Sequence, residues 1–103
     1  MNQVYKLTTK DGFSDDWELK NQIKRSVISV MSNIAEGFDR ASDKEFIKFL
    51  RISTGSCAEL KSQLYIALDQ DYISQEEFDS AYEQATKVNK LINGFIRYLK
   101  KGK

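Results

Sequence analysis

Apolar residues recur every three or four positions in three long stretches of the chain, a spacing that places them on one face of an α-helix. The first stretch starts at Asp15, which can form a capping box with Glu18, after a turn predicted at Asp11 and Gly12. It ends at Gly37, because glycine readily adopts the left-handed conformation that follows many helices. The expected core stripe of this helix is Trp17, Leu19, Ile23, Val27, Val30, Met31 and Ile34.

The second stretch begins with a capping box of Ser42 and Glu45 and extends to about Asp71. A helix of this length spans roughly 40 Å at about 1.5 Å per residue, which only a rod-shaped bundle accommodates in a chain of 103 residues. Its expected core stripe is Phe46, Phe49, Leu50, Ser53, Cys57, Leu60, Leu64 and Leu68.

The third stretch has the clearest start, because Ser74 and Glu77 form a capping box while Ile73 and Phe78 occupy the two positions of a hydrophobic staple. Its expected core stripe is Phe78, Ala81, Ala85, Val88, Leu91, Ile92, Phe95 and Leu99. Short connections make neighbouring helices antiparallel, and the segment Val4 to Thr8 is long enough only for the stub of another helix. The sequence therefore predicts an all-α, antiparallel bundle that forms one domain over residues 1–103.

The composition also favours helices and excludes several kinds of functional site. The chain has no proline and no histidine, so ferritin-like metal sites built from Glu-x-x-His and phosphotransfer from histidine are excluded. The single cysteine, Cys57, lies within an apolar stripe and is interpreted as a packed hydrophobe. Glu36 and Glu59 can pair across antiparallel helices, but nothing nearby supplies a nucleophile or a ligand set, so helix-capping or interhelical hydrogen bonds are preferred. We expect a protein without enzymatic activity, metal or cofactor.

The same composition bears on location. A lone cysteine forms no internal disulfide, no apolar stretch approaches the ~18 residues of a membrane span, and no secretory signal is visible. These features predict a cytoplasmic protein that does not associate with membranes.

Charge is polarised along the chain although the net charge is only +1. Lys44, Lys48 and Arg51 share a narrow stripe opposite the core face of the second helix, where bases oppose the helix macrodipole. Antiparallel packing should gather bases at one end of the bundle: Arg40, Lys44, Lys48, Arg51, Arg97, Lys100 and Lys101. Two interpretations remain open, namely binding of nucleic-acid phosphates and a solvated surface.

Several short motifs are spread over roughly Val4 to Lys101: Gln22-Ile23-Lys24-Arg25, Asn33-Ile34-Ala35-Glu36-Gly37, Arg40, Lys44-Glu45-Phe46, Gly55-Ser56-Cys57-Ala58-Glu59-Leu60, Gln63-Leu64, Tyr72-Ile73-Ser74 and Asn93-Gly94-Phe95-Ile96. Together they resemble the family of four-helix-bundle proteins encoded by intervening sequences of bacterial 23S ribosomal RNA genes.

The resemblance implies a four-helix bundle that assembles into a barrel-shaped homopentamer. One branch of the family serves as the accessory protein of diversity-generating retroelements and binds a reverse transcriptase and nucleic acid through basic surfaces. Two departures matter here. The first helix is shortened to about Val4–Thr8, which weakens the inference of a pentamer unless the natural start lies upstream, and a proline common in the next helix is Met31 here, which should leave that helix straighter.

Apolar residues also project away from the expected core, and we expect them to form an oligomer interface: Trp17, Ile47, Ile52, Tyr65 and Ile66. The leading hypothesis is a non-enzymatic homo-oligomeric scaffold that binds RNA or DNA phosphates through Lys24, Arg25, Arg40, Lys44, Lys48, Arg51 and Arg97. The alternative is a protein-interaction adaptor without nucleic-acid binding. The sequence leaves open the partner, the choice between RNA and DNA and the number of subunits.

Overall fold

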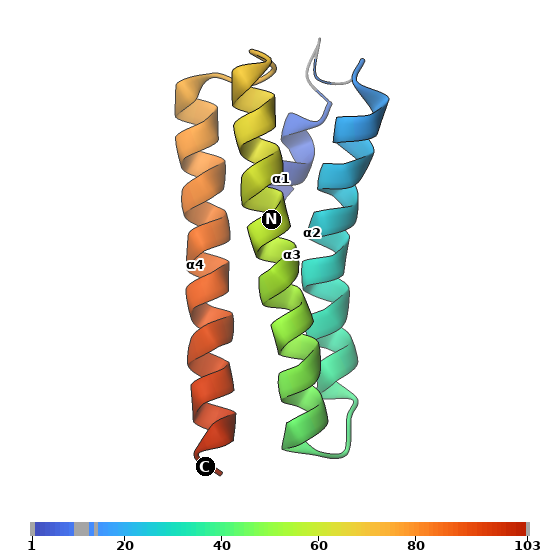
Figure 1. Cartoon of the computed structure of the whole chain (residues 1–103), viewed down its shortest axis with the longest axis vertical. Helices are drawn as coiled ribbons and strands as arrows, with labels where there is room; N and C mark the ends of the chain where they lie inside the picture. The colour runs from blue at the N-terminus through green and yellow to red at the C-terminus, as the bar shows by residue number, and fades with distance from the viewer. Residues whose placement is uncertain (1, 10–12, 14, 103) are drawn as a thin grey trace.

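The computed structural model describes residues 2–9, 13 and 15–102, and these form a rod with extents of 47 × 22 × 17 Å. Four helices follow in order: α1 (Asn2–Leu7), α2 (Trp17–Phe38), α3 (Asp43–Asp69) and α4 (Gln75–Lys100). Helix α3 packs between α2 and α4, and the short α1 lies behind it (Figure 1). The predicted all-α antiparallel bundle with a short first helix is confirmed, while the turn expected at Asp11 and Gly12 lies outside the described residues.

The start of α2 differs by one residue from the prediction. Asp16, rather than Asp15, caps the helix, and its carboxylate accepts a hydrogen bond from the Leu19 amide at 3.0 Å. The other oxygen of Asp16 accepts a hydrogen bond from the Tyr72 hydroxyl, also at 3.0 Å. Because Tyr72 follows α3, this second bond ties the start of α2 to the α3–α4 turn and selects Asp16 as the cap.

The two remaining helix starts are confirmed. The Ser42 side chain accepts a hydrogen bond from the Glu45 amide at the start of α3. Ser74 and Glu77 form both hydrogen bonds of a capping box at the start of α4. A capping side chain pairs with backbone N–H groups at a helix start that would otherwise lack a partner. Local sequence patterns therefore predicted the starts of α3 and α4 correctly.

Gly37 does not end α2, as the sequence had suggested, but lies within its last turn. The helix continues to Phe38 and is capped by Asp39. A Cβ atom built on Gly37 would lie 2.5 Å from Cδ1 of Phe46 and 3.3 Å from Cβ of Phe49. Glycine is therefore required here by the close approach of α3, not by a left-handed backbone.

Left-handed backbone instead follows α3, where Asp71 has a φ of 59°, and α4, where Gly102 has a φ of 68°. Helix α3 ends at Asp69, two residues before the predicted end. After the turn, Ile73 and Phe78 are both buried in one core cluster, as the hydrophobic staple requires.

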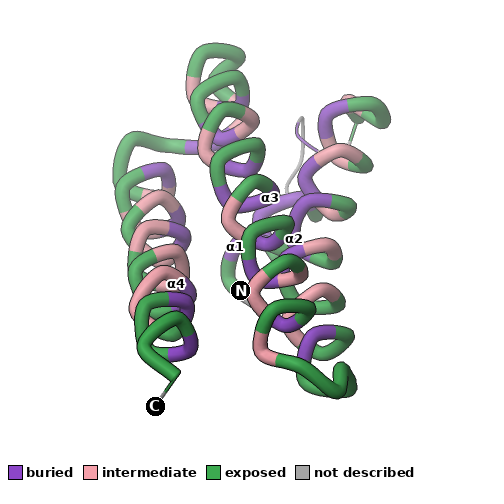
Figure 2. Tube along the Cα trace, turned by 60° about the horizontal axis from the view of Figure 1, so that its bottom comes forward, coloured by how far each residue is buried: buried purple, intermediate pink, exposed green. Residues whose placement is uncertain are grey.

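Buried residues form two clusters along the rod, and Figure 2 shows them on the sides of the helices that face one another. The upper core includes α1 and consists of Val4, Leu7, Phe13, Leu19, Ile23, Val27, Leu60, Leu64, Ala67, Ile73, Phe78, Ala81 and Ala85. The lower core contains no residue of α1 and consists of Val30, Phe46, Leu50, Cys57, Ile92, Ile96 and Leu99. The bundle thus has four helices in its upper half and three in its lower half.

This asymmetry overturns part of the predicted core. Leu91 is 75% exposed, Met31 is 53% exposed and Phe95 is 38% exposed, although all three belong to the expected stripes. They lie in the lower half, where no fourth helix covers them. Cys57, in contrast, is fully buried as predicted, and burial raises the pKa of its thiol.

Within the described residues, no helix is long and apolar enough to cross a bilayer.

Candidate nucleic-acid interface

Three exposed bases follow one another along the first half of α3. Lys44, Lys48 and Arg51 are four and three residues apart, so they lie on one side of the helix over roughly 10 Å. None of the ion pairs described for residues 2–9, 13 and 15–102 involves them. We call these three residues the basic stripe.

The basic stripe does not stabilise the helix that carries it. Lys44 lies in the first turn of α3, where the macrodipole disfavours a positive charge by about 0.3–1 kcal/mol. Lys48 faces Lys44 on one side and Arg51 on the other, and like charges at these spacings repel by about 0.2–0.5 kcal/mol per pair. Lys44 thus opposes the dipole of its own helix, and the three bases repel one another, although Glu45 lies three residues before Lys48 and offsets part of this repulsion.

Further bases lie at the same end of the bundle. Arg97, Lys100 and Lys101 are exposed at the end of α4, and this end lies beside the start of α3 at the bottom of Figure 1. In contrast to the basic stripe, Arg97 and Lys100 complement the dipole of their own helix. The basic start of α3 and the basic end of α4 therefore lie at the same end of the bundle, as expected.

Arg40 also belongs to this end, but it is engaged within the chain. Its guanidinium forms an ion pair with Glu36 at 3.0 Å and lies 4.7 Å from the ring centre of Phe49. These contacts leave Arg40 less available to an outside anion than the basic stripe.

Lys24 and Arg25 do not join the other predicted bases. They lie more than half the length of α2 before Arg40, which follows the end of that helix; the separation is roughly 23 Å at about 1.5 Å per residue. The Lys24 ammonium lies 5.2 Å from the ring centre of Tyr5, in α1, while Arg25 lines a groove elsewhere on α2. The predicted seven-residue site is therefore two separate regions, because residues near the start of a long helix cannot reach its end.

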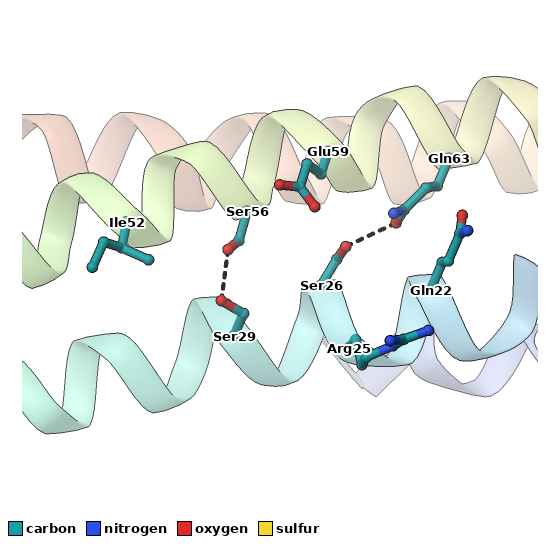
Figure 3. Close-up of a pocket in the computed structure, with 8 residues that line it drawn as sticks. All are labelled: Gln22, Arg25, Ser26, Ser29, Ile52, Ser56, Glu59 and Gln63. Carbon is teal, nitrogen blue, oxygen red and sulfur yellow. Dashed lines mark hydrogen bonds between the residues drawn. The ribbon is translucent and has the colours of Figure 1, made fainter.

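The groove beside Arg25 runs between α2 and α3 and has a volume of about 630 Å³. Hydrogen bonds cross its floor: the Ser26 hydroxyl donates to Oε1 of Gln63 at 2.9 Å, and the hydroxyls of Ser29 and Ser56 are 2.7 Å apart (Figure 3). The complete lining is Gln22, Arg25, Ser26, Ser29, Ile52, Ser56, Glu59 and Gln63. This groove is a polar helix seam in which the Ser26–Gln63 and Ser29–Ser56 pairs bond across the helices, whereas no hydrogen bond is described for Gln22, Arg25 or Glu59.

Glu36 and Glu59 do not meet across the helices. Ser29 pairs with Ser56, and Gly37 packs on Phe46, so Glu36 lies opposite the first turns of α3 rather than opposite Glu59. Glu36 instead pairs with Arg40. Among the described residues no three carboxylate, cysteine or histidine side chains lie close enough to hold a metal ion.

Four of the five predicted interface residues are exposed: Trp17 (67%), Tyr65 (54%), Ile66 (48%) and Ile52 (44%). Ile47 is the exception, because it is half-buried and packs against the lower core. Tyr65 also has partners within the chain, since its ring lies 4.8 Å from that of Phe78 and 5.6 Å from that of Tyr82. Ile52 and Ile66 are thus the best remaining candidates on α3.

Sequence reasoning missed an apolar surface in the lower half of the bundle. It has an indentation of about 150 Å³ between α2, α3 and α4, lined by Ile34, Phe38, Phe46, Leu50, Leu91, Ile92 and Phe95. We call this indentation, with its exposed neighbours Met31 and Tyr98, the open slot. The helix lengths could have revealed this surface, because α1 has only 6 residues whereas α4 has 26.

Comparison with known proteins agrees with this architecture. Residues 1–94 match the sequence profile of the 23S rRNA-intervening sequence proteins. A similar solved structure is a protein with unknown function from the S23 ribosomal protein family of Bacteroides thetaiotaomicron, with 27% identity and a TM-score of 0.82 over 92% of this chain and 86% of that chain. A search of curated proteins gave no match. The chain belongs to the family of 23S rRNA-intervening sequence proteins.

Proposed function

We propose that this protein is a non-enzymatic, homo-oligomeric helical scaffold that binds RNA or DNA phosphates through the basic stripe. The observation that carries the proposal is that Lys44, Lys48 and Arg51 are exposed and have no ion-pair partner among the described residues, and that Lys44 opposes the dipole of α3 in its first turn. A phosphate backbone supplies the negative charge that such a stripe lacks.

The chemistry of the stripe favours phosphate contacts over base recognition. Arg97 and Lys100 at the same end extend the positive surface. Reading a sequence requires hydrogen bonds to base edges or stacking on aromatic rings. The Phe49 ring is already covered by the Arg40 guanidinium, and the exposed rings of Phe38 and Tyr98 at this end belong to the open slot, not to the basic stripe. Binding should therefore depend strongly on salt and little on sequence.

Assembly of several copies would strengthen such binding. Ile52 and Ile66 leave apolar surface on α3 that a second subunit would bury. A closed symmetric oligomer would repeat the basic stripe around its axis, and each further contact to one nucleic acid would become intramolecular. The candidate protein partner, by the family resemblance, is a reverse transcriptase.

The experiment is a titration of the protein with a structured RNA and with a DNA duplex at two salt concentrations, with oligomer mass measured in the same buffers. Neutralisation of three phosphates per subunit predicts a loss of roughly 2–3 log units of affinity per log unit of salt. The combined variant Lys44→Glu, Lys48→Glu and Arg51→Glu should abolish binding without loss of helical signal.

A matched control reverses three bases in the other half of the bundle that the predicted site does not include: Lys6→Glu, Lys20→Glu and Lys61→Glu. It changes the net charge equally, so affinity that falls only for the basic-stripe variant identifies the stripe itself. Equal losses of affinity in both variants would show that net charge, and not the position of the bases, determines binding. Absence of binding even at low salt would favour the alternative, an adaptor that recognises a protein through its exposed apolar residues.

A further inference from the structure

The groove between α2 and α3 has a cation on one wall and an anion on the other, and the two do not pair. Arg25 is exposed on α2, Glu59 is exposed on α3, and both line the groove. Within the described part of the chain, neither side chain has an ion pair or a hydrogen bond. Both charges are therefore available to a ligand that carries both signs.

The relative position of these charges follows from the floor of the groove. Two hydrogen bonds cross the floor and set the register of the antiparallel helices: Ser26 with Gln63 and Ser29 with Ser56 (Figure 3). In this register Arg25 lies opposite α3 at about position 62, which is about three residues beyond Glu59. The two charged residues are thus offset by roughly 5 Å along the groove, at about 1.5 Å per residue.

The groups that line the groove change in character from one end to the other. The upper end supplies N–H donors from Arg25, Gln22 and Nε2 of Gln63, whose Oε1 already accepts a hydrogen bond. Glu59, an acceptor when ionised, lies in the middle. Ile52, which is 44% exposed, lies at the lower end (Figure 3). The order along the groove is therefore donors, acceptor and apolar surface.

This order matches a short peptide with free termini. A carboxylate accepts the two parallel N–H bonds that a guanidinium such as that of Arg25 offers, and an ammonium group donates to a carboxylate such as Glu59. The terminal charges of an extended dipeptide are separated by roughly 6–7 Å, at about 3.3–3.6 Å per residue, which is comparable with the offset of the two walls. The dipeptide would lie along the groove with its carboxylate at the upper end.

The first side chain of such a dipeptide would meet apolar surface. Ile52 lies seven residues before Glu59, or roughly 10 Å along the same side of α3. A side chain that starts beside the ammonium group at Glu59 must be large to reach Ile52, as phenylalanine is. The exposed isoleucine thus favours a large apolar first residue.

The size and charge of the groove argue against two other small ligands. Its volume of about 630 Å³ lies within the range of about 300–1,000 Å³ typical of small-molecule sites. A free amino acid has both charges attached to one carbon, which is too close to span the offset. A phosphate ester would place negative charge beside Glu59 with Arg25 as the one cation of the lining.

We propose that this groove binds a zwitterionic dipeptide with a large apolar first residue. Its carboxylate binds Arg25, its ammonium group binds Glu59, and its first side chain covers Ile52. The site shares no residue with the basic stripe, so the inference goes beyond phosphate binding and does not depend on it.

The probe is the dipeptide Phe-Gly, titrated into ¹⁵N-labelled full-length protein and followed by amide chemical shifts in NMR spectra. N-acetyl-Phe-Gly lacks the ammonium group, and Phe-Gly amide lacks the carboxylate. We expect Phe-Gly to shift the side-chain amide signals of Gln22 and Gln63. Each capped form should bind at least tenfold more weakly.

Variants assign each end of the ligand to its wall. Arg25→Gln should weaken binding of Phe-Gly at least tenfold and remove its advantage over Phe-Gly amide. Glu59→Gln should likewise remove the advantage over N-acetyl-Phe-Gly. Ile52→Ala should reduce the preference for Phe-Gly over Gly-Gly.

Lys24→Gln is the matched control for Arg25→Gln. It removes one positive charge at the adjacent position, where the ammonium group lies over the Tyr5 ring and outside the groove. Affinity for Phe-Gly should not change in this variant. Helical signal and melting temperature verify that all variants are folded.

Three results would overturn the proposal: no shift of the groove amides in the native protein, equal affinity for Phe-Gly and both capped forms, or equal weakening by Arg25→Gln and Lys24→Gln. A second subunit is the competing explanation for the exposure of Ile52. If Ile52→Ala dissociates an oligomer and leaves the preference for Phe-Gly over Gly-Gly unchanged, the assignment of the apolar end is wrong.

Discussion

Gly37 and Gly55 show at the residue scale how the same amino acid serves different roles in neighbouring helices. A Cβ on Gly37 would enter the ring of Phe46, whereas a Cβ on Gly55 meets no atom within 4 Å. Both glycines lie within helices, where glycine is about 1 kcal/mol less favourable than alanine. The first glycine is therefore required by packing, and the second lowers the stability of α3 without a packing reason.

Substitution of each glycine by alanine should consequently have opposite effects. Gly55→Ala should raise the free energy of unfolding by about 0.5–1 kcal/mol. Gly37→Ala should lower it by about 1–2 kcal/mol, because overpacking against Phe46 outweighs the gain in helix propensity. Urea denaturation measures both changes. If Gly37→Ala is stabilising as well, the close approach of α2 and α3 relaxes more easily than the packing indicates.

Cys57 provides a second prediction at this scale. Burial raises the pKa of the thiol above its ordinary value of 9.0, and the nearby Lys61 lowers it only in part. The native protein should react very slowly with a thiol reagent at neutral pH and rapidly once unfolded by denaturant. Because the folded state favours the protonated thiol, Cys57 contributes its full share to the free energy of unfolding below pH 9. This contribution is lost as the pH rises further. Rapid reaction without denaturant would show that the lower core opens readily.

Helix boundaries explain much of what sequence alone could predict at the element scale. Ser42, Ser74 and the staple of Ile73 with Phe78 depend on residues close in sequence, and all were located correctly. The start at Asp16 was missed because its selection depends on Tyr72, in a distant turn. Gly37 was misread for the same reason, since its role depends on Phe46 of the next helix.

The basic stripe yields a prediction about α3 itself. Lys44→Glu should raise the free energy of unfolding by about 0.5–1 kcal/mol, because it removes a base from the first turn and converts repulsion with Lys48 into attraction. Lys100→Glu, at the end of α4, should lower stability by a similar mechanism. Thermal or urea unfolding at low salt measures both. No stabilisation by Lys44→Glu would mean that Lys44 has a stabilising role within the fold.

The whole molecule divides into halves that sequence patterns could not distinguish. Periodicity assigned Met31, Leu91 and Phe95 to the core because it reports which face of a helix is apolar, not whether another helix reaches that face. The predicted nucleic-acid site was divided for a related reason: Lys24 and Arg25 lie in the first half of α2, whereas Arg40 follows its end, so more than half the length of that helix separates them. Local patterns thus predicted the helices. Which apolar faces the short first helix covers could be seen only in the assembled structure.

The two halves should differ in how readily they open. The upper core is enclosed by four helices, and Gln3 of α1 bonds to Ser80 of α4. The lower core is enclosed by three helices and leaves Leu91 and Phe95 exposed. Fewer buried apolar contacts lower the free energy of local opening. Amides of α4 between Leu91 and Leu99 should therefore exchange hydrogen faster than those between Phe78 and Val88, as measured by mass spectrometry.

End fraying of α4 is a competing explanation, and the variant Leu7→Ala separates the two. It truncates a buried contact of α1 with the upper core and should cost about 2–5 kcal/mol of global stability. Hydrogen exchange of the amides between Phe78 and Val88 should then approach the faster rate of the lower segment, because α1 stabilises the upper core less in this variant. If both segments accelerate by the same factor, the bundle opens as one unit and the open slot does not mark a separately unfolding half.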